Sequence, residues 1–422
     1  MKLKSVNLHS RARSFFCCTG SIIGISIAGL ILVFFIIQTN PSIGALGADF
    51  LRSIIGDRAV ASIEMDVNQA ADFLQRLRFQ LGLETPASPW TALPATPLMP
   101  PPSNNLTATS TSVVNQPSLT NQSTHPSTTP NPFEPSSTPT QMIWPPVAIA
   151  PAGTAAGEGI WTAYIQDVQG NTVAYRTFYQ PDPSRPYSLV AIVAIDLTHT
   201  RLHFVLGTVE PAGENHTARS GAIPTPDQAP NVLLAAFNGG FKARHGEFGA
   251  MADGITAIPP REGLGTVATY ENGKVELGEW GTEITLTPDT TAFRQNGPLV
   301  IQHGQINPRI YNNSPQDWGY TVNDVSPTVR SGIGLSEDEK TLYYFCGPSL
   351  SMEALAKAMQ AAGVWNAIQL DINNYWTLFV RFIPTGTKLV PEALLPKLMV
   401  SNVGRYLWNY SRDYFYITDD VK

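Results

Sequence analysis

The first residues that could take part in binding or catalysis follow an apolar run at 235–237. They stand in the order Asn238, Gly239, Gly240, Lys242 and His245. Two adjacent glycines let a ligand approach the backbone closely and present N–H groups that can bind an anion. An amide side chain at the end of a strand can bind hydroxyl groups. The pattern therefore predicts a polar binding site, although an ordinary turn is the simpler interpretation of the glycines alone.

Two charged residues further along the chain are also candidates. Asp371 ends the apolar run 364–370, and Arg330 opens the run 330–335, in which alternate glycines indicate close backbone packing. An arginine beside a strand is more often a surface residue than a ligand clamp. A strand that ends in a carboxylate after a strand–helix unit is a common way to place a polar group at the edge of a sheet.

The elements that must position these residues are mostly short strands. Ser351 is a good N-cap, Glu353 suits the first helical turn and Gly363 suits the C-terminus, so we expect a helix over 351–362. Asn272-Gly273 predicts a tight hairpin, because both residues accept positive φ. Strands are predicted near 187–195, 202–206, 232–237, 266–270, 274–277 and 341–345. We expect an α+β fold in which one large domain, residues 154–422, has a mixed twisted β-sheet core and flanking helices.

Charge and cysteine content exclude several classes of protein. The chain has a formal net charge of −6, and its basic excess is confined to the N-terminus, so a nucleic-acid-binding surface is not expected. Three cysteines, of which Cys17 and Cys18 are neighbours, cannot make a disulfide framework. The seven histidines are scattered, so we expect neither a metal site nor another cofactor.

The N-terminal part of the chain resembles a membrane anchor. Residues 19–37 contain no charge, and only basic charges precede them, so we expect a cytoplasmic tail at 1–18 and a single transmembrane helix at 19–37. The C-terminal domain would then be extracytoplasmic. A signal peptide cleaved near Ala45-Leu46-Gly47 is the alternative, although the apolar run is longer than usual for one.

A stalk is expected between the anchor and the domain. Apolar residues recur at helical spacing through 48–83, which predicts an amphipathic helical segment within 41–84. That segment could lie on the membrane, pair with a second copy of the chain or pack on the distal domain. Residues 85–153 are rich in proline, serine and threonine and carry one charge, Glu134, so they are predicted to form a disordered linker.

Taken in order, several motifs of the C-terminal part resemble the phosphodiester glycosidase family. The matching segments are PNVLLAAFNGGF at 230–241, NGPLVIQHGQI at 296–306, TVRSGIGLSEDEKTLYYF at 328–345 and SMEALAKAMQAAGVWNAIQLD at 351–371. The resemblance covers roughly 190–382. The family usually reads Asp-Gly-Gly-Gly-Ser at the end of the last motif, whereas this chain continues from Asp371 as Ile-Asn-Asn-Tyr-Trp.

The resemblance implies a hydrolase that acts on glycosyl phosphodiesters or related cell-surface glycans. It implies Asn238, Arg330 and Asp371 as site residues, with backbone contributions from Gly239 and Gly240. Asp371 would be a base or nucleophile, Arg330 would hold the anion, and Asn238 would orient sugar hydroxyls. Other residues expected at such a site are Glu247 and Asp253 as a second carboxylate, and Lys242, His245, Tyr375 and Trp376 as substrate contacts.

A second hypothesis is a non-catalytic glycan-binding module on the same fold. Tyr375 and Trp376 follow the altered motif and could stack on sugar rings in either case. Trp365 lies in a predicted strand, where we expect it to pack against its neighbours. The partners expected from the sequence are thus a membrane, a carbohydrate or sugar-phosphate substrate and, through 48–83, a second copy of the chain.

Overall fold

The computed structural model describes residues 50–90, 144–213, 217–312, 317–318, 327–400 and 402–420. The predicted membrane segment at 19–37 and most of the predicted linker lie outside these residues. No helix in the described part of the chain is both long enough and apolar enough to cross a membrane.

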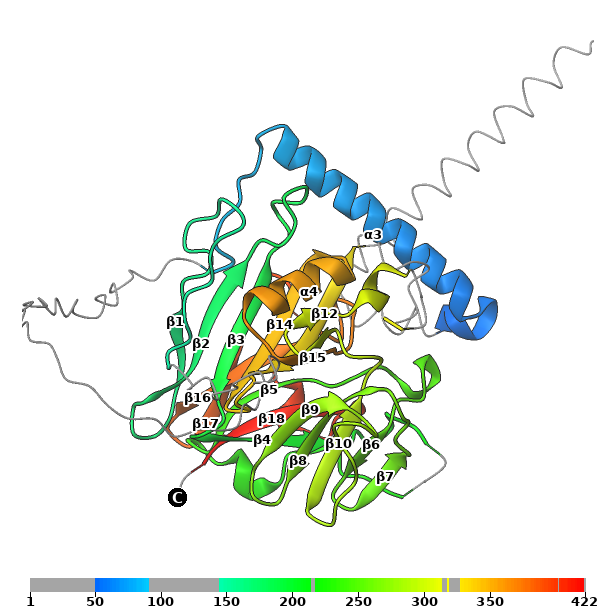
Figure 1. Ribbon diagram of the computed structural model, residues 1–422, viewed down its shortest axis with the longest axis vertical. Helices are drawn as coiled ribbons and strands as arrows, with labels where there is room; N and C mark the ends of the chain where they lie inside the picture. The colour runs from blue at the N-terminus through cyan, green and yellow to red at the C-terminus, as the bar shows by residue number, and fades with distance from the viewer. Residues whose placement is uncertain are drawn as a thin grey trace, which may run out of the picture.

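An eight-stranded sheet forms the centre of the molecule (Figure 1). Its strands, in spatial order, are β1 (Thr162–Gln166), β2 (Thr172–Tyr179), β3 (Val190–Asp196), β14 (Thr341–Leu350), β13 (Thr328–Leu335), β15 (Asn366–Gln369), β11 (Ile301–Gln302) and β12 (Gln305–Ile306). Every pair of neighbouring strands in this sheet is antiparallel.

Two five-stranded antiparallel sheets complete the β structure. The β5-centred sheet contains β17 (Lys388–Ala393), β16 (Phe379–Thr385), β5 (Leu233–Asn238), β18 (Tyr414–Asp419) and β4 (Thr200–Val205) in that order. The β8-centred sheet contains β7 (Ile255–Ile258), β6 (Ala250–Ala252), β10 (Thr290–Gln295), β8 (Gly265–Tyr270) and β9 (Val275–Glu279). The structure therefore confirms a single domain, but the predicted mixed sheet is wrong, because the paired strands within all three sheets run antiparallel.

The main core lies between the eight-stranded sheet and the β5-centred sheet. Phe237 on β5 is fully buried, and its ring lies 5.1 Å from that of Tyr344 on β14 and 5.3 Å from that of Phe415 on β18. These rings join the two sheets face to face, as in other β-sandwiches. Strand β3 has no exposed residue because it contributes to this core on one face and to a second core under a helix on the other.

That helix, α4 (Met352–Ala361), begins and ends where the sequence predicts. The Ser351 hydroxyl accepts a hydrogen bond from the Ala354 N–H at 3.1 Å, and Gly363 takes a φ of +77° after the last turn. The helix connects β14 to β15 across β13. It lies close to the sheet because Gly332 and Gly334 lack side chains there: a Cβ on Gly332 would lie 2.4 Å from the Met359 Cε.

A second long helix, α3 (Asp57–Gln80), crosses the outside of the domain (Figure 1). Residues 50–55 are also helical. The buried Asp72 carboxylate joins α3 to the domain, since it accepts hydrogen bonds from Arg185 Nε at 3.0 Å and from the Tyr187 hydroxyl at 2.7 Å. The Phe79 ring packs 5.2 Å from that of Tyr187. Of the three arrangements left open by the sequence, packing on the distal domain is therefore observed.

Both ends of the predicted linker contact the domain. The Trp90 indole N–H donates to the Leu394 carbonyl at 2.7 Å, and the Trp144 indole N–H donates to the Thr172 carbonyl at 2.9 Å. Ile149 is buried in the core beneath α4. The folded unit thus extends N-terminally beyond the predicted boundary at 154, because aromatic and aliphatic side chains within 85–153 find apolar surface on the sheet.

Four short 3₁₀ helices lie in the connections, namely η1 (Thr225–Gln228), η2 (Ala243–His245), η3 (Pro308–Tyr311) and η4 (Arg405–Leu407). The predicted hairpin also forms: Gly273 has a φ of +84° in the turn between β8 and β9.

Candidate functional site

Asn238 lies at the end of β5, where the sequence places it, and its amide joins three elements. Its Oδ1 accepts hydrogen bonds from the Tyr344 hydroxyl at 2.9 Å and from the Leu378 N–H at 3.2 Å. Its Nδ2 donates to the Ser331 hydroxyl at 3.0 Å. The residue is 4% exposed, so these contacts make Asn238 a positioning group for the strand ends around it.

The two glycines after Asn238 present their backbone to the chain's own carboxylate. The Gly240 N–H donates to Asp413 Oδ2 at 3.0 Å, and a Cβ on Gly239 would lie 2.3 Å from the same oxygen. Asp413 also accepts a hydrogen bond from Arg294 Nε at 2.8 Å, and neither side chain is exposed. The anion that the Asn-Gly-Gly turn binds in this structure is therefore Asp413, which differs from the expected exogenous ligand.

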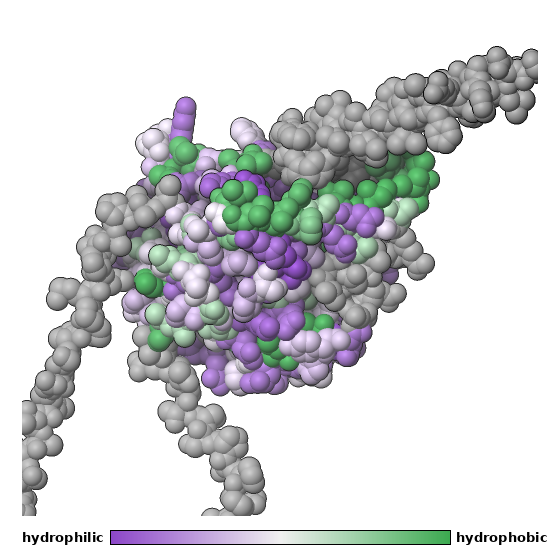
Figure 2. Space-filling model, turned by 90° about the horizontal axis from the view of Figure 1, so that it is seen from above, coloured by the Kyte–Doolittle hydropathy of each residue, from purple (hydrophilic) through white to green (hydrophobic). Residues whose placement is uncertain are grey.

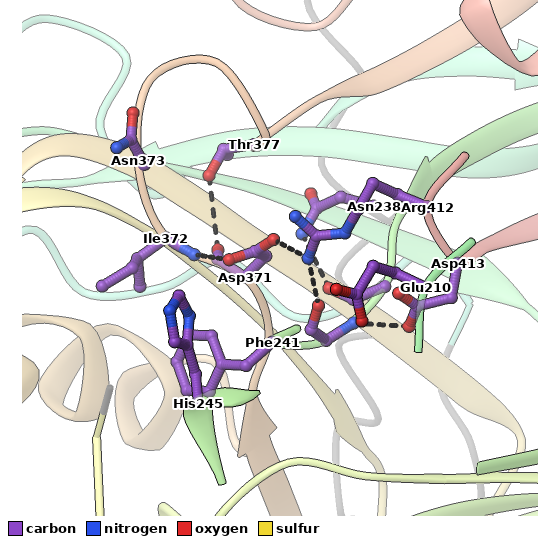
Figure 3. Close-up of polar contacts among 12 residues, drawn as sticks. Glu210, Asn238, Phe241, His245, Asp371, Ile372, Asn373, Thr377, Arg412 and Asp413 are labelled. Carbon is purple, nitrogen blue, oxygen red and sulfur yellow. Dashed lines mark hydrogen bonds and ion pairs between the residues drawn. The ribbon is translucent and has the colours of Figure 1, made fainter. Parts of the chain in front are cut away.

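Asp371 lies beside this turn, two residues after the end of β15 (Figure 3). Its backbone N–H donates to the Gly239 carbonyl at 3.0 Å. One carboxylate oxygen accepts from the Ile372 N–H at 2.9 Å, and the other pairs with Arg412 Nη2 at 2.5 Å. The structure thus brings together the Asn238 and Asp371 positions, which the sequence separates by more than a hundred residues.

The environment of Asp371 changes its acidity. Burial raises the pKa of this carboxyl from 3.8 to about 6, even though the charge of Arg412 opposes the increase; the negative charge of Asp413 adds to it. Burial lowers the pKa of Arg412, but the charges of Asp371 and Asp413 outweigh that effect and leave it raised. Asp371 therefore changes charge close to neutral pH while its arginine partner stays protonated.

The loop that follows Asp371, residues 372–376, contains no glycine. Among residues 372–376, only Asn373 has a positive φ, at 89°. Asparagine enters the left-handed region more readily than most residues. Its side-chain oxygen accepts from the Tyr375 N–H at 3.3 Å and its backbone N–H donates to the Val329 carbonyl at 3.0 Å, which fixes the loop.

Aromatic rings and cations gather at this loop. The Trp376 ring has the Arg412 guanidinium 4.6 Å and the Lys242 ammonium 5.1 Å from its centroid. The Tyr375 ring contacts Trp376 edge to face at 4.5 Å, and Arg405 lies 5.4 Å from the Tyr375 centroid. Both aromatic rings are partly exposed. This group of residues could stack on a sugar and bind an anionic substituent.

Arg330 does not join this cluster. It is fully buried on β13, where its Nε donates to the Leu350 carbonyl at 2.9 Å. Its neighbour Ser331 faces Asn238 and Asp371, and successive side chains of a strand point to opposite faces. Arg330 therefore points toward the α4 side of the sheet. The prediction that it lies beside Asp371 is wrong, and the arginine found there is Arg412.

The other predicted carboxylates also lie elsewhere. Glu247 is exposed in the loop after η2, and Asp253 is exposed in the turn between β6 and β7, where its charge acts on His203 and Tyr416. The charges that chiefly shift the pKa of Asp371 are instead those of Arg412 and Asp413. His245 is half-buried at the end of η2 and accepts from Arg244 Nε at 3.2 Å.

Sequence reasoning missed the charged residues that act on Asp371 directly or through its partners. These are Arg412, Asp413, Arg294 and Glu210. Glu210 accepts hydrogen bonds from the Ala243 and Ala212 N–H groups, both at 3.0 Å. The available signal was the Arg-Asp pair directly before the apolar run 414–417, since charges at the start of a buried strand require partners. Among the described residues, no group of three or more histidine, cysteine or acidic side chains could hold a metal ion.

Comparison with known proteins agrees with the resemblance seen in the sequence. Residues 231–372 match the model of the phosphodiester glycosidase family, which confirms that resemblance for this part of the chain. The matched region contains Asn238, the Asn-Gly-Gly turn and Asp371, but not Arg412 or Asp413. No curated protein gives a significant match.

Solved structures similar to this chain were also found. One is the catalytic domain of zebrafish N-acetylglucosamine-1-phosphodiester alpha-N-acetylglucosaminidase, auto-inhibited by its pro-peptide, with 14% identity over 62% of this chain and 88% of that chain and a TM-score of 0.39. A hypothetical protein from Synechocystis has 12% identity, with 61% and 62% covered and a TM-score of 0.29. A putative exported protein from Burkholderia pseudomallei has 11% identity, with 55% and 74% covered and a TM-score of 0.27.

Proposed function

We propose that the chain is a hydrolase that cleaves glycosyl phosphodiesters or related cell-surface glycans. The family match at 231–372 supports this reaction class. The observation that carries the proposal is the buried Asp371 carboxyl, whose pKa is raised to about 6 beside Arg412. A carboxyl with such a pKa is suited to proton transfer near neutral pH.

In the proposed reaction, ionised Asp371 accepts a proton from a water molecule whose oxygen attacks the anomeric carbon. The bond from that carbon to the phosphate oxygen breaks, and its electron pair leaves with the phosphate. The products are a free sugar and a phosphomonoester, and Asp371 then returns the proton to solvent. Phosphate is a competent leaving group, so the step requires cations more than a second acid. Arg412 and Lys242 take the anion-stabilising role that the family resemblance assigned to Arg330.

The test is hydrolysis by the purified chain of a panel of sugar 1-phosphodiesters, followed by detection of the free sugar and the phosphomonoester. Asp371→Asn removes the proton acceptor and preserves the side-chain shape, so turnover should be lost. Asp253→Asn is a matched control, because that carboxylate is exposed in the turn between β6 and β7. Equal turnover in the two variants would contradict the assignment.

A glycan-binding module remains the second candidate, and one observation favours it. Both carboxylate oxygens of Asp371 already accept hydrogen bonds from protein, from the Ile372 N–H and from Arg412. In a site that only binds, Trp376→Ala should weaken glycan affinity more than Asp371→Asn, because stacking area matters more than one charge there.

We also propose that the hydrolase is anchored in a membrane with its C-terminal domain outside the cytoplasm. The uncharged run at 19–37 and the basic residues before it support this topology. A reporter enzyme that works only outside the cytoplasm should be active when fused after Lys422. Activity of a cytoplasm-only reporter at the same position would reverse the topology.

A further inference from the structure

The outward face of α3 carries an apolar stripe. The residues that form it, which we call the α3 seam, are Ile63, Val67, Ala70, Leu74, Leu77 and Leu81. Leu74 is 56% exposed and Leu81 is 64% exposed, although both are large and apolar. Seen from the side on which α3 lies, hydrophobic side chains gather along this part of the surface (Figure 2).

The α3 seam lies opposite the face of α3 that contacts the domain. Asp72 stands nine residues, or two and a half helical turns, from both Ile63 and Leu81. Asp72 binds Arg185 and Tyr187, so the face that holds α3 on the domain is already occupied. The seam therefore does not face the domain. An ordinary surface helix turns its apolar side inward, so the outward position of these apolar residues needs an explanation.

The spacing of the α3 seam is that of a coiled coil. Its residues alternate steps of four and three, which places Val67, Leu74 and Leu81 at heptad position a and Ile63, Ala70 and Leu77 at position d. Asp66 flanks the stripe on one side and Arg78 on the other, and the exposed Phe73 lies next to it on the Asp66 side. A strict a/d stripe is typical of a helix–helix seam. A helix that lies on a membrane has a wider apolar face with basic residues around it, whereas α3 carries four acidic and three basic residues.

We propose that the α3 seam pairs in parallel with the α3 seam of a second copy of this chain. The sequence supplies the reason for a parallel pair: only residues 38–49 separate the proposed anchor from the start of the helical region at Phe50. Two chains anchored in one membrane emerge in the same direction, and the shared surface raises the effective concentration of one helix for the other. In a parallel pair Phe73, at position g, meets Arg78, at position e, of the other copy, and no like charges oppose each other across the pair.

Cysteine cross-linking of the full chain in lipid vesicles tests this proposal. Cys17 and Cys18 are first replaced by serine, and the buried Cys346 is left in place. Leu74→Cys places a thiol at an a position, where the two Cα atoms of a parallel pair approach the ~6 Å that disulfides prefer. Gln69→Cys is the matched control on the same exposed surface but outside the seam. We expect mild oxidation to yield at least about fivefold more disulfide dimer from Leu74→Cys than from Gln69→Cys.

Two further measurements distinguish a second copy of the chain from the membrane as the partner of the α3 seam. Leu77→Glu added to the Leu74→Cys chain should abolish the excess of cross-linked dimer, while the domain's thermal unfolding changes little because Leu77 is 39% exposed and outside the buried core clusters. Equal cross-linking at 69 and 74 would overturn the proposal. Quenching by brominated lipids of a fluorophore attached at Leu74→Cys, without cross-linking, would also overturn it and would assign the face to the membrane. Because neither readout depends on hydrolysis, failure of the proposed activity leaves this test intact.

Discussion

Two arginine–aspartate pairs lie side by side at the end of β5, and they differ in their exposure and in how many donors of the arginine are used. In the Arg294–Asp413 pair neither side chain is exposed, and Arg294 donates additionally to the Phe248, Gln295 and Phe241 carbonyls. In the Arg412–Asp371 pair the side chains retain 6% and 10% exposure. Within the described structure, each pair has one buried atom without a hydrogen-bond partner: the donor Arg412 Nε in this pair and the acceptor Asp413 Oδ1 in the other.

This difference indicates a structural role for the first pair and a functional role for the second. A fully buried pair whose arginine uses all of its nitrogen donors holds segments together, and its lack of exposure keeps it from a ligand. The second pair keeps an unused donor, some exposure and a carboxyl with a raised pKa, and it borders a loop of partly exposed aromatic rings. We therefore expect substitutions in the first pair to change stability and substitutions in the second to change function.

The largest expected effect is on turnover. Asp371→Asn should lower kcat by about 10⁴-fold, because it removes the proton acceptor without changing the shape of the site. Sugar affinity should change little. Single-turnover and steady-state kinetics on a sugar 1-phosphodiester would measure both quantities, and a loss confined to KM would mean that Asp371 only binds.

Arg294→Met should destabilise the fold by about 3–5 kcal/mol, since it leaves the Asp413 carboxylate buried without its cation. Arg309→Met is the matched control: Arg309 also pairs with an aspartate, Asp317, but its side chain is 52% exposed. Arg309→Met should lower the free energy of unfolding by less than about 1 kcal/mol. Urea denaturation of both variants measures the difference, and equal losses would remove the distinction between the two pairs.

The pH dependence tests the raised pKa of Asp371. As a base, Asp371 must be ionised, so kcat/KM should rise as pH increases and level off above about 6. Its effect on stability has the opposite direction. Because the folded-state pKa exceeds the unfolded value, the contribution is fully present below about pH 4 and is lost as pH rises through about 6.

That loss should amount to about 3 kcal/mol of unfolding free energy, at 1.36 kcal/mol for each pKa unit. Comparing urea denaturation of the native chain and Asp371→Asn at pH 4 and pH 7 isolates it, since asparagine does not titrate. If the difference in unfolding free energy between the two proteins is the same at pH 4 and pH 7, Arg412 holds the pKa of Asp371 near its ordinary value.

The smallest expected effect is at the aromatic loop. Trp376→Ala should raise KM by about two- to tenfold, the equivalent of one lost stacking contact, and leave kcat nearly unchanged. Trp365→Ala is the control of the same type, because Trp365 packs against His303 at 5.3 Å, away from the loop. Equal changes in the two variants would exclude a role for Trp376 in binding.

Local signals in the sequence predicted local structure well. The Ser351 cap, the Asn272-Gly273 hairpin and the position of Asn238 at a strand end each depend on residues adjacent in the chain. Arg330 shows why the site was harder to predict. Its strand was recognisable, but a shift of one residue decides which face of the sheet a side chain occupies. Ser331, not Arg330, faces Asp371.

The partners of Asp371 required knowledge of the topology. Arg412 and Asp413 precede β18, which pairs with β5 and thereby brings these charges to Gly239 and Gly240. Nothing in the sequence near Asn238 indicates that strand pairing. In α3, likewise, periodicity predicted the helix, but the choice of the face that contacts the domain depends on Asp72 meeting Arg185, more than a hundred residues away.

The contacts of Trp90 and Trp144 change what the proline-rich segment can do. The chain leaves the folded unit after Trp90 and returns at Trp144, so the 53 residues between them begin and end on the same body. Such a segment is a closed loop, and its length cannot set the distance between an anchor and the domain. Only residues 38–49 can do so. Loop-closure entropy changes by about 0.6 kcal/mol for each doubling of length, so cutting the segment to a quarter should stabilise the domain by about 1.2 kcal/mol without changing its distance from the proposed anchor.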